Sequence, residues 1–100
     1  MVKKGKMDDK LVLVTGSGTG IGREIALEFA REGAVVALHY AHSADGAESA
    51  VKEIISMGGK AKSFKADLQD VEQAKKLTLE AIDFMGGIDV VVNNAGITMT

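Results

Sequence analysis

The chain has 100 residues, of which 46% are hydrophobic and 26% are charged, and it contains 12 glycines. This composition is typical of a soluble globular α/β protein, and the length allows one domain at most. The formal net charge of -2 argues against nucleic-acid binding, and the absence of cysteine excludes disulfides, thiolate metal sites and a cysteine nucleophile.

The N-terminal segment carries no secretion or membrane signal. Its lysines are followed by Gly5, Asp8, Asp9 and Lys10, and the apolar run that comes next covers only residues 11–14. That run is far too short for a signal peptide or a membrane span. We therefore expect a cytoplasmic protein that binds neither a membrane nor nucleic acid.

The first two predicted elements are a strand and a helix. Residues 11–14 form a continuous apolar run, which indicates a strand buried on both faces. A helix is predicted over residues 21–32, because apolar side chains recur there at helical spacing and Gly33 follows as a stop. The predicted apolar face consists of Ile21, Ile25, Phe29, Ala26 and Ala30.

Five further elements follow. A second strand is predicted over residues 34–38, a second helix over about 45–57, and a polar, alternating strand over 61–65 that suits a sheet edge. Asp70 and Gln73 predict an N-cap pair for a third helix that ends at Gly86 and Gly87, and residues 88–92 predict a buried strand. The inward residues would be Ala47, Ala50, Val51, Ile54 and Ile55 in the second helix, and Val71, Ala74, Leu77, Ala81, Ile82 and Met85 in the third.

Alternating strands and helices of this length predict an α/β fold with parallel strands joined by right-handed crossovers. We expect the Rossmann-type doubly wound parallel sheet, with strand order 3-2-1-4 and the third helix on the opposite face from the first two. One helix cannot cover a face built for several, and the fourth strand has no partner beyond it. Residues 1–100 are therefore interpreted as the N-terminal part of a single dinucleotide-binding domain whose remainder is absent.

A glycine-rich turn joins the first strand to the first helix. Glycines there let a phosphate approach the free N–H groups at the helix start, and Ser17 and Thr19 add hydroxyl donors. Four alternating glycines at this place favour nucleotide binding over an ordinary sharp turn. They are Gly16, Gly18, Gly20 and Gly22.

The register of the turn separates the kinds of nucleotide site. The fingerprint G-x-G-x-x-G requires glycine where Ile21 stands, and an NTPase phosphate loop requires a lysine where only Arg23 follows. A methyltransferase would match the glycines of residues 16–20, but it usually needs an acid near the first glycine and another after the second strand. Val14, Thr15 and Tyr40 stand at those places.

The pattern that fits is T-G-x-x-x-G-x-G, written here as Thr15-Gly16 and Gly20-Ile21-Gly22. It resembles the short-chain dehydrogenase/reductase family. Asp67-Leu68 and Asn93-Asn94-Ala95-Gly96 follow the third and fourth predicted strands at the spacing of that family, so the resemblance extends from Lys10 onward. Residues 40–43 are most similar to the 3-oxoacyl-carrier-protein reductase, glucose dehydrogenase and polyketide ketone reductase branches.

The resemblance implies a cofactor site at the ends of the strands. The pyrophosphate would lie against Ser17, Thr19, Gly20 and Ile21, and the adenine ring would meet Asp67 and Leu68. The adenosine ribose would meet Asn93, Ala95 and Gly96, while Asn93 and Asn94 would also tie strands together. Asp67 could instead merely end a strand, and Asn94 is expected to be more structural than cofactor-touching.

The end of the second strand decides which dinucleotide is held. A carboxylate there would bind both ribose hydroxyls and repel a 2′-phosphate, but the residue is Tyr40, and His42 and Ser43 could donate to a phosphate. NADP is therefore favoured over NAD, although many phosphate-preferring relatives carry Arg or Lys where Thr19 stands. No metal site is expected, because His39 and His42 point to opposite sides of a strand and lack acidic or cysteine partners.

No catalytic residue is expected within the chain. In the resembled family a Ser and a Tyr-x-x-x-Lys motif supply acid and base, and the only tyrosine here, Tyr40, belongs to the adenosine end. The chain alone should be inactive, whereas the parent would be a homo-oligomeric (tetramer or dimer) NAD(P)-dependent oxidoreductase. It would interconvert a ketone and a secondary alcohol, with a small carbonyl or alcohol substrate. The alternative is a stand-alone nucleotide-binding module without catalysis.

Overall fold

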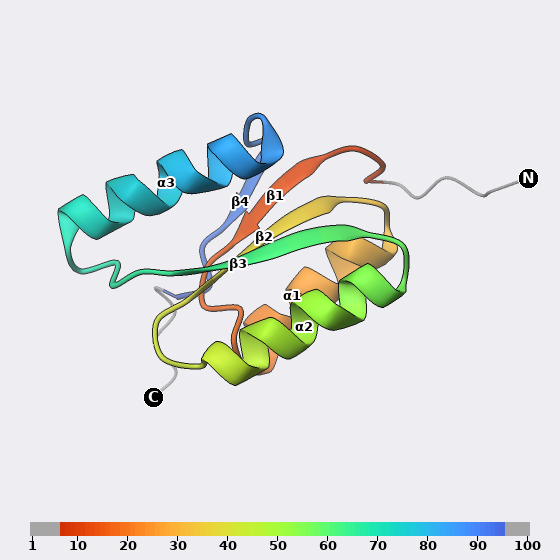
Figure 1. Cartoon of the computed structure of the whole chain (residues 1–100), viewed down its shortest axis with the longest axis horizontal. Helices are drawn as coiled ribbons and strands as arrows, with labels where there is room; N and C mark the ends of the chain where they lie inside the picture. Colours follow the sequence, from red (N-terminus) through yellow and green to blue (C-terminus); the bar gives the residue numbers. More distant parts are fainter. Residues whose placement is uncertain (1–6, 96–100) are drawn as a thin grey trace, which may run out of the picture.

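The computed structural model describes residues 7–95, in which strands and helices alternate along the chain. The strands are β1 (Leu11–Val14), β2 (Val35–Tyr40), β3 (Lys60–Lys65) and β4 (Val90–Val92), and the helices are α1 (Gly20–Arg31), α2 (Ala44–Ser56) and α3 (Val71–Met85). This order along the chain confirms the prediction. Figure 1 shows one sheet with helices on both sides. None of the helices in this range is both long and apolar enough to cross a bilayer.

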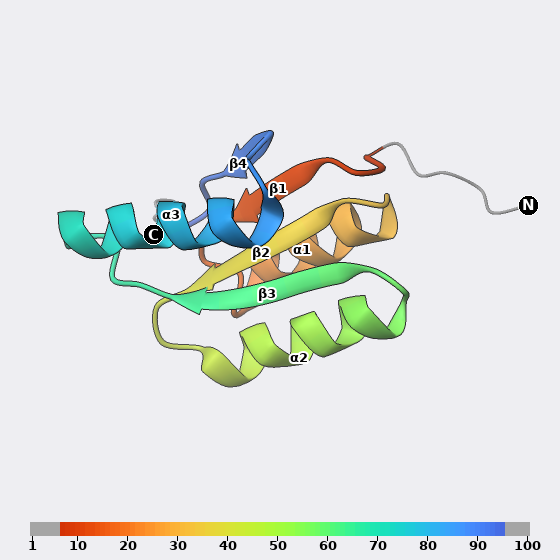
Figure 2. The same ribbon diagram turned by 45° about the horizontal axis from the view of Figure 1, so that its top comes forward.

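The sheet is parallel throughout and has the predicted order β3-β2-β1-β4. β1 has a neighbour on each side, because Val12 pairs with Val36 of β2 and with Val90 of β4. Figure 2 shows the arrowheads of β2 and β3 pointing the same way. The lysine-rich β3 occupies an edge, as its polarity predicted, since exposed charges protect an edge from pairing with another chain.

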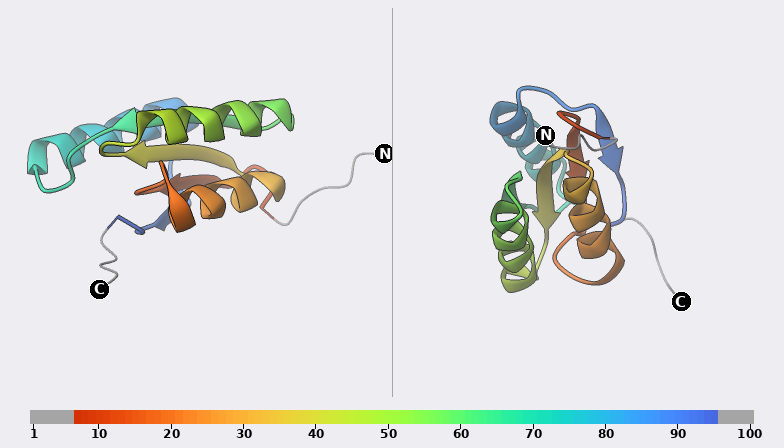
Figure 3. Two further views of the ribbon diagram at one scale, coloured as in Figure 1. Left: turned by 90° about the horizontal axis from the view of Figure 1, so that it is seen from below. Right: turned by 90° about the vertical axis from the view of Figure 1, so that its right-hand side faces the viewer.

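Helices α1 and α2 cover one face of the sheet and α3 covers the other, as predicted (Figure 1). Seen from below, α1 and α2 run side by side (Figure 3). Side chains along β1 alternate between the faces, so Val12 and Val14 pack toward α1 and α2 while Leu13 packs toward α3. The continuous apolar run of this strand follows from helices covering both faces.

The buried faces of the helices are narrower than the apolar pattern predicted. In α1 the buried residues are Gly22, Ala26, Leu27 and Ala30, whereas Ile21 is 61% exposed and Ile25 and Phe29 are half-buried. Ile55, Val71 and Ile82 are also exposed, although they were expected to face inward. Ile55 and Ile82 each stand one residue beyond a fully buried position, which turns the side chain about 100° away from the sheet. Val71 is the first residue of α3.

Three strands differ from their predicted bounds. β3 begins one residue earlier, at Lys60, which pairs with Val35. At the starts of β2 and β4, hydrogen bonds outside the ladder involve the outer residues. Ala34 donates its N–H to Phe29 O at 3.1 Å, so it belongs to the turn that follows α1, and β2 runs from Val35 to Tyr40. At the start of β4 the side chain of Asp89 accepts from Leu11 N at 2.9 Å, and the strand begins only at Val90.

The predicted cap of α3 is confirmed. The carboxylate of Asp70 accepts from the backbone N–H groups of Glu72 and Gln73, and it also accepts from the Gln73 amide at 3.3 Å. Gln73 in turn accepts from Asp67 N at 2.8 Å. The cap of α3 therefore fixes the loop that follows β3, which carries two of the predicted site residues.

Candidate cofactor site

The predicted site residues that the structure describes lie after the carboxyl ends of β1, β2, β3 and β4. In a parallel sheet these ends share one edge, and the strand order reverses between β1 and β4, whose connections leave in opposite directions. This is where open α/β sheets bind their ligands. Gly96 lies outside the described residues.

The glycine turn after β1 requires two of its glycines for close packing. A Cβ on Gly22 would overlap the carbonyl oxygen of Gly16, and a Cβ on Gly18 would lie 2.7 Å from Cβ of Ser43. Gly16 and Gly22 thus bring the start of α1 against the end of β1, and Gly18 brings the turn against the loop after β2. Gly18 and Gly22 are buried.

The part of the turn that remains open is the start of α1. Thr19 is the N-cap residue, but its side chain makes no capping hydrogen bond, and the first turn of α1 contains no acidic residue. Gly20 has a positive φ of 55° and nothing within 4 Å of the place where a Cβ would stand. The first N–H groups of a helix lack intrahelical partners, so this helix start can accept an anion from the solvent side.

The Ser17 hydroxyl forms hydrogen bonds inside the turn and does not point toward the open start of α1. The residue is fully buried, and its hydroxyl lies 3.1 Å from Val14 O and 3.0 Å from His39 O. Of the two hydroxyls expected near the phosphate, only that of Thr19 is on an exposed residue.

The residues after β4 are tied to the turn after β1. Thr15 Oγ1 accepts from Ala95 N at 3.0 Å and lies 3.3 Å from Asn93 Oδ1, and Asn94 Nδ2 donates to Gly16 O at 3.1 Å. Asn93 and Ala95 nevertheless remain exposed, whereas Asn94 is half-buried. Asn94 therefore holds the turn, while its two neighbours stay accessible.

A hollow lies between the ends of β2 and β3. It is lined by Ala41, His42, Lys65, Asp67, Gln69 and Gln73. Asp67 is exposed and accepts from Gln69 N at 2.9 Å, and Leu68 packs partly against the core beneath α3. Tyr40 is half-buried and pairs with Lys65 in the sheet.

Lys65 is a candidate residue that sequence reasoning missed. Its ammonium is the cation of this hollow, beside the exposed His42, and within residues 7–95 it makes no ion pair. The sequence signal was available, because Lys65 ends the third predicted strand two residues before Asp67. Only the register of β3 against β2 places it next to Tyr40.

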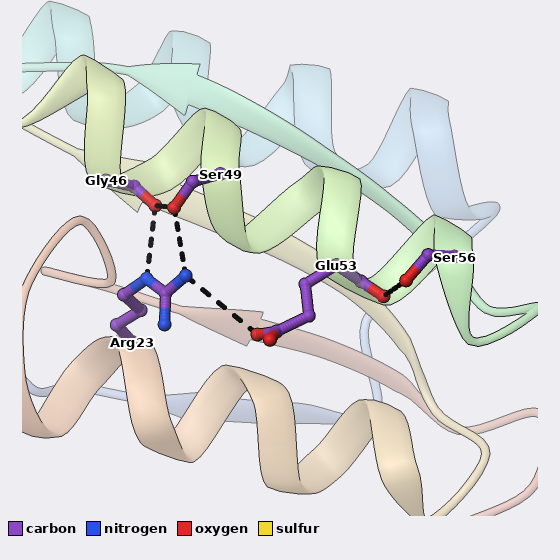
Figure 4. A network of polar contacts seen from close by, with 5 residues as sticks. All are labelled: Arg23, Gly46, Ser49, Glu53 and Ser56. Carbon is purple, nitrogen blue, oxygen red and sulfur yellow. Dashed lines mark hydrogen bonds and ion pairs between the residues drawn. The ribbon is translucent and has the colours of Figure 1, made fainter.

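Helices α1 and α2 are joined close to the turn by Arg23 (Figure 4). Its guanidinium donates to Ser49 Oγ at 2.9 Å and to Gly46 O at 3.4 Å, and it lies 3.9 Å from the Glu53 carboxylate. Gly46 also contacts the turn directly, because a Cβ there would overlap Gly18 O. The loop that carries His42 and Ser43 is thereby fixed against the glycine turn.

His39 was missed as well, since the sequence pattern marked it only as an unsuitable metal ligand. It is 1% exposed, and its two ring nitrogens contact Gly16 N at 3.0 Å and Ala66 O at 2.8 Å. His42 is exposed on the following loop. The two histidines therefore do not act together.

A parallel sheet with this strand order and an open helix start where that order reverses defines a Rossmann-type nucleotide-binding domain. Comparison with known proteins narrows the class. The sequence model of the short chain dehydrogenase family matches residues 10–100. The chain therefore belongs to the short-chain dehydrogenase/reductase family.

Individual relatives agree with this assignment. A short chain dehydrogenase/reductase of Aspergillus novofumigatus is 45% identical over 93 residues, which are 93% of this chain and 35% of that protein. A short chain dehydrogenase from Burkholderia cenocepacia, solved in complex with NADP, has a TM-score of 0.90 and 37% identity and covers 95% of this chain and 39% of its own. The chain spans about a third of the length of the curated relatives it matches.

A third relative was solved with the other cofactor. A 7α-hydroxysteroid dehydrogenase complexed with NADH has a TM-score of 0.83 and 38% identity, and the match covers 87% of this chain and 34% of that chain. Overall similarity to these structures therefore leaves the choice between the two dinucleotides to the residues at the end of β2.

Proposed function

We propose that this chain holds the NADP(H) of an oxidoreductase that interconverts a ketone and a secondary alcohol. The observation that carries the proposal is the uncapped start of α1, which has no acidic residue in its first turn and faces the carboxyl edge of a parallel sheet. Membership of the short-chain dehydrogenase/reductase family supports it. The nicotinamide, when bound, supplies or accepts the hydride.

The pyrophosphate would be held by backbone N–H groups of Thr19, Gly20 and Ile21 and by the Thr19 hydroxyl. Ser17, Gly16, Gly18 and Gly22 would shape the turn. Asp67 and Leu68 would bound the adenine, and Asn93 and Ala95, together with Gly96, would bound the adenosine ribose. Each of these roles is inferred from the family pattern and from the exposure of the residues.

NADP is preferred over NAD in this proposal because the end of β2 has no acidic residue and Lys65, at the end of β3, places a cation beside it. Tyr40 has no carboxylate that would repel a 2′-phosphate. Lys65, with His42 and Ser43, offers N–H and O–H donors on the same side as the turn. The Lys65 ammonium would form a charge-assisted hydrogen bond to the phosphate, and the other two residues would add neutral donors.

The acid and base of the reaction would come from the part of the parent enzyme beyond this sequence. We propose that residues 1–100 are the N-terminal part of one dinucleotide-binding domain in a cytoplasmic homo-oligomer. Its substrate would be a small carbonyl compound or alcohol. The residues named above bind and orient the cofactor and leave the nicotinamide end free for that substrate.

Titration of the protein made from its complete reading frame with NADPH and NADH tests the proposal. We expect saturable binding of both with NADPH bound more tightly, and a Tyr-x-x-x-Lys motif in the residues that follow Thr100. Failure to bind either dinucleotide would refute it. A reading frame without that motif, combined with cooperative melting and NADPH binding by the 100-residue chain, would instead establish a stand-alone binding module.

A further inference from the structure

His39 is a polar side chain enclosed at the cofactor edge of the sheet. It belongs to β2, one residue before the end of the strand, and is 1% exposed. Burying an imidazole is unfavourable unless its ring nitrogens are hydrogen-bonded. Both are, and neither bond is a bond of the sheet itself.

The two partners determine the form of the ring. Gly16 N can only donate, so Nδ1, at 3.0 Å, must accept from it. Ala66 O can only accept, so Nε2, at 2.8 Å, must carry the proton. One neutral tautomer satisfies both bonds, and the imidazole has no freedom to turn over without losing both.

The bonds connect two parts of the candidate site. Gly16 begins the glycine turn, and the backbone oxygen of His39 also accepts from Ser17 N at 2.8 Å. Ala66 directly precedes Asp67, and its own N–H donates to Tyr40 O at 3.1 Å. One residue therefore engages the first two amides of the turn and fixes it relative to the end of β3, while the amides from Gly18 onward remain outside its reach.

We propose that His39 is a positioning residue for the cofactor. Its neutral imidazole orients the glycine turn through Gly16 and sets the distance between the pyrophosphate side and the adenine side of the site. An apolar side chain of similar size would fill the same space without accepting from Gly16. The inference rests on the proposed cofactor function, and it adds a residue that acts through the turn without touching the cofactor.

Three substitutions in the protein made from the complete reading frame separate the two bonds. In His39→Asn the side-chain oxygen stands near the former Nδ1 and can still accept from Gly16. In His39→Gln the amide nitrogen stands near the former Nε2 and can still donate to Ala66, and His39→Leu removes both bonds. We expect His39→Asn to keep NADPH affinity within about threefold, and His39→Gln and His39→Leu to lose about tenfold, the effect of one typical hydrogen bond.

Stability serves as the matched control. His39→Asn and His39→Gln each lose one bond, so their melting temperatures should fall by similar amounts while their NADPH affinities differ. Leu77→Ala, in the core beneath α3, should lower the melting temperature without changing the affinity. Equal NADPH affinity in the Asn and Gln variants would overturn the inference while leaving cofactor binding intact.

NMR of the imidazole nitrogens supplies a readout that needs no cofactor. The expected signature is a protonated Nε2 and an unprotonated Nδ1, with slow solvent exchange of the Gly16 N–H that speeds up in His39→Gln. A proton on Nδ1 would overturn the inference by itself. If the wild-type protein binds neither dinucleotide, both the proposed function and this inference are refuted.

Discussion

At the scale of single residues, the charged side chains near Tyr40 at the cofactor edge are Lys65 and Asp67. Tyr40 and Lys65 are paired neighbours at the ends of β2 and β3. The carboxylate of Asp67 accepts a hydrogen bond from Gln69 N within the loop that follows β3. A 2′-phosphate placed beside Tyr40 would meet the Lys65 cation, and the carboxylate of the same hollow, Asp67, already accepts that hydrogen bond. Two substitutions test this arrangement of charge from opposite directions.

Tyr40→Asp should shift selectivity toward NAD. The new carboxylate would accept from both ribose hydroxyls and repel a 2′-phosphate, so the ratio of NADP to NAD affinity should fall by about tenfold or more. Tyr40→Phe is the control and should leave the ratio unchanged. The check is the dissociation constant of each cofactor in the full-length enzyme, and an unchanged ratio in Tyr40→Asp would contradict the placement of Tyr40.

Lys65→Met should weaken NADP binding without affecting NAD. Removing one exposed cation from a phosphate costs up to about 1 kcal/mol, or about fivefold in affinity. Lys62→Met is the matched control, because Lys62 is exposed on the same strand but lies over the Phe64 ring. Equal losses for both cofactors would show that Lys65 acts on the fold rather than on the phosphate.

At the scale of elements, the helix ends fix the loops of the site. Arg23 holds the start of α2 against α1, and Asp70 caps α3 while Gln73 holds Asp67 N. The loops after β2 and β3 are therefore anchored by side chains of neighbouring helices, Arg23 of α1 and Gln73 of α3. The loops need little rearrangement to accept a ligand, which favours binding by avoiding an ordering cost.

Asp70→Ala should destabilise the protein by about 1 kcal/mol, because two N–H groups at the start of α3 lose their acceptor. Asp70→Ser keeps a capping oxygen and should recover most of that loss. The measurement is the urea unfolding midpoint of the full-length protein. If the alanine and serine variants unfold at the same midpoint, the Asp70 cap does not stabilise α3.

At the scale of the whole molecule, the surface of α1 remains partly uncovered. Ile21, Ile25 and Phe29 of α1 line a groove with Met7, and Val91 of β4 is 56% exposed. An apolar groove of this kind usually marks a surface that another part of a protein covers. We propose that the rest of the parent domain packs there, since the chain spans about a third of its relatives.

Phe29→Ser tests that proposal. In the full-length protein it should cost about 3 kcal/mol, the usual cost of removing a buried aromatic ring, and it should cost much less in the 100-residue chain. Lys52→Ser, at an exposed position of α2, should change neither. Free energies of unfolding from urea titration would decide, and an equally small effect of Phe29→Ser in both forms would mean that α1 stays uncovered.

Much of the fold could be predicted because the signals are local. Continuous apolar runs, glycine stops and the Asp70 cap identify the elements, and the strand order is the one expected of a dinucleotide-binding sheet. The inward faces of the helices were harder, since Ile21, Ile55 and Ile82 carry the apolar period but point away from the sheet. Periodicity locates a stripe on a helix, whereas the angle at which the helix crosses the sheet decides which side of the stripe is buried.

Residue type and spacing along the chain were enough to predict the strand order, the glycine turn and the family. Three features of the site emerged only from the folded chain: Ser17 faces inward, Lys65 stands beside Tyr40, and His39 joins Gly16 to Ala66. Each of these contacts joins residues on different strands or loops. The register between neighbouring strands sets such contacts, and no local sequence pattern specifies them.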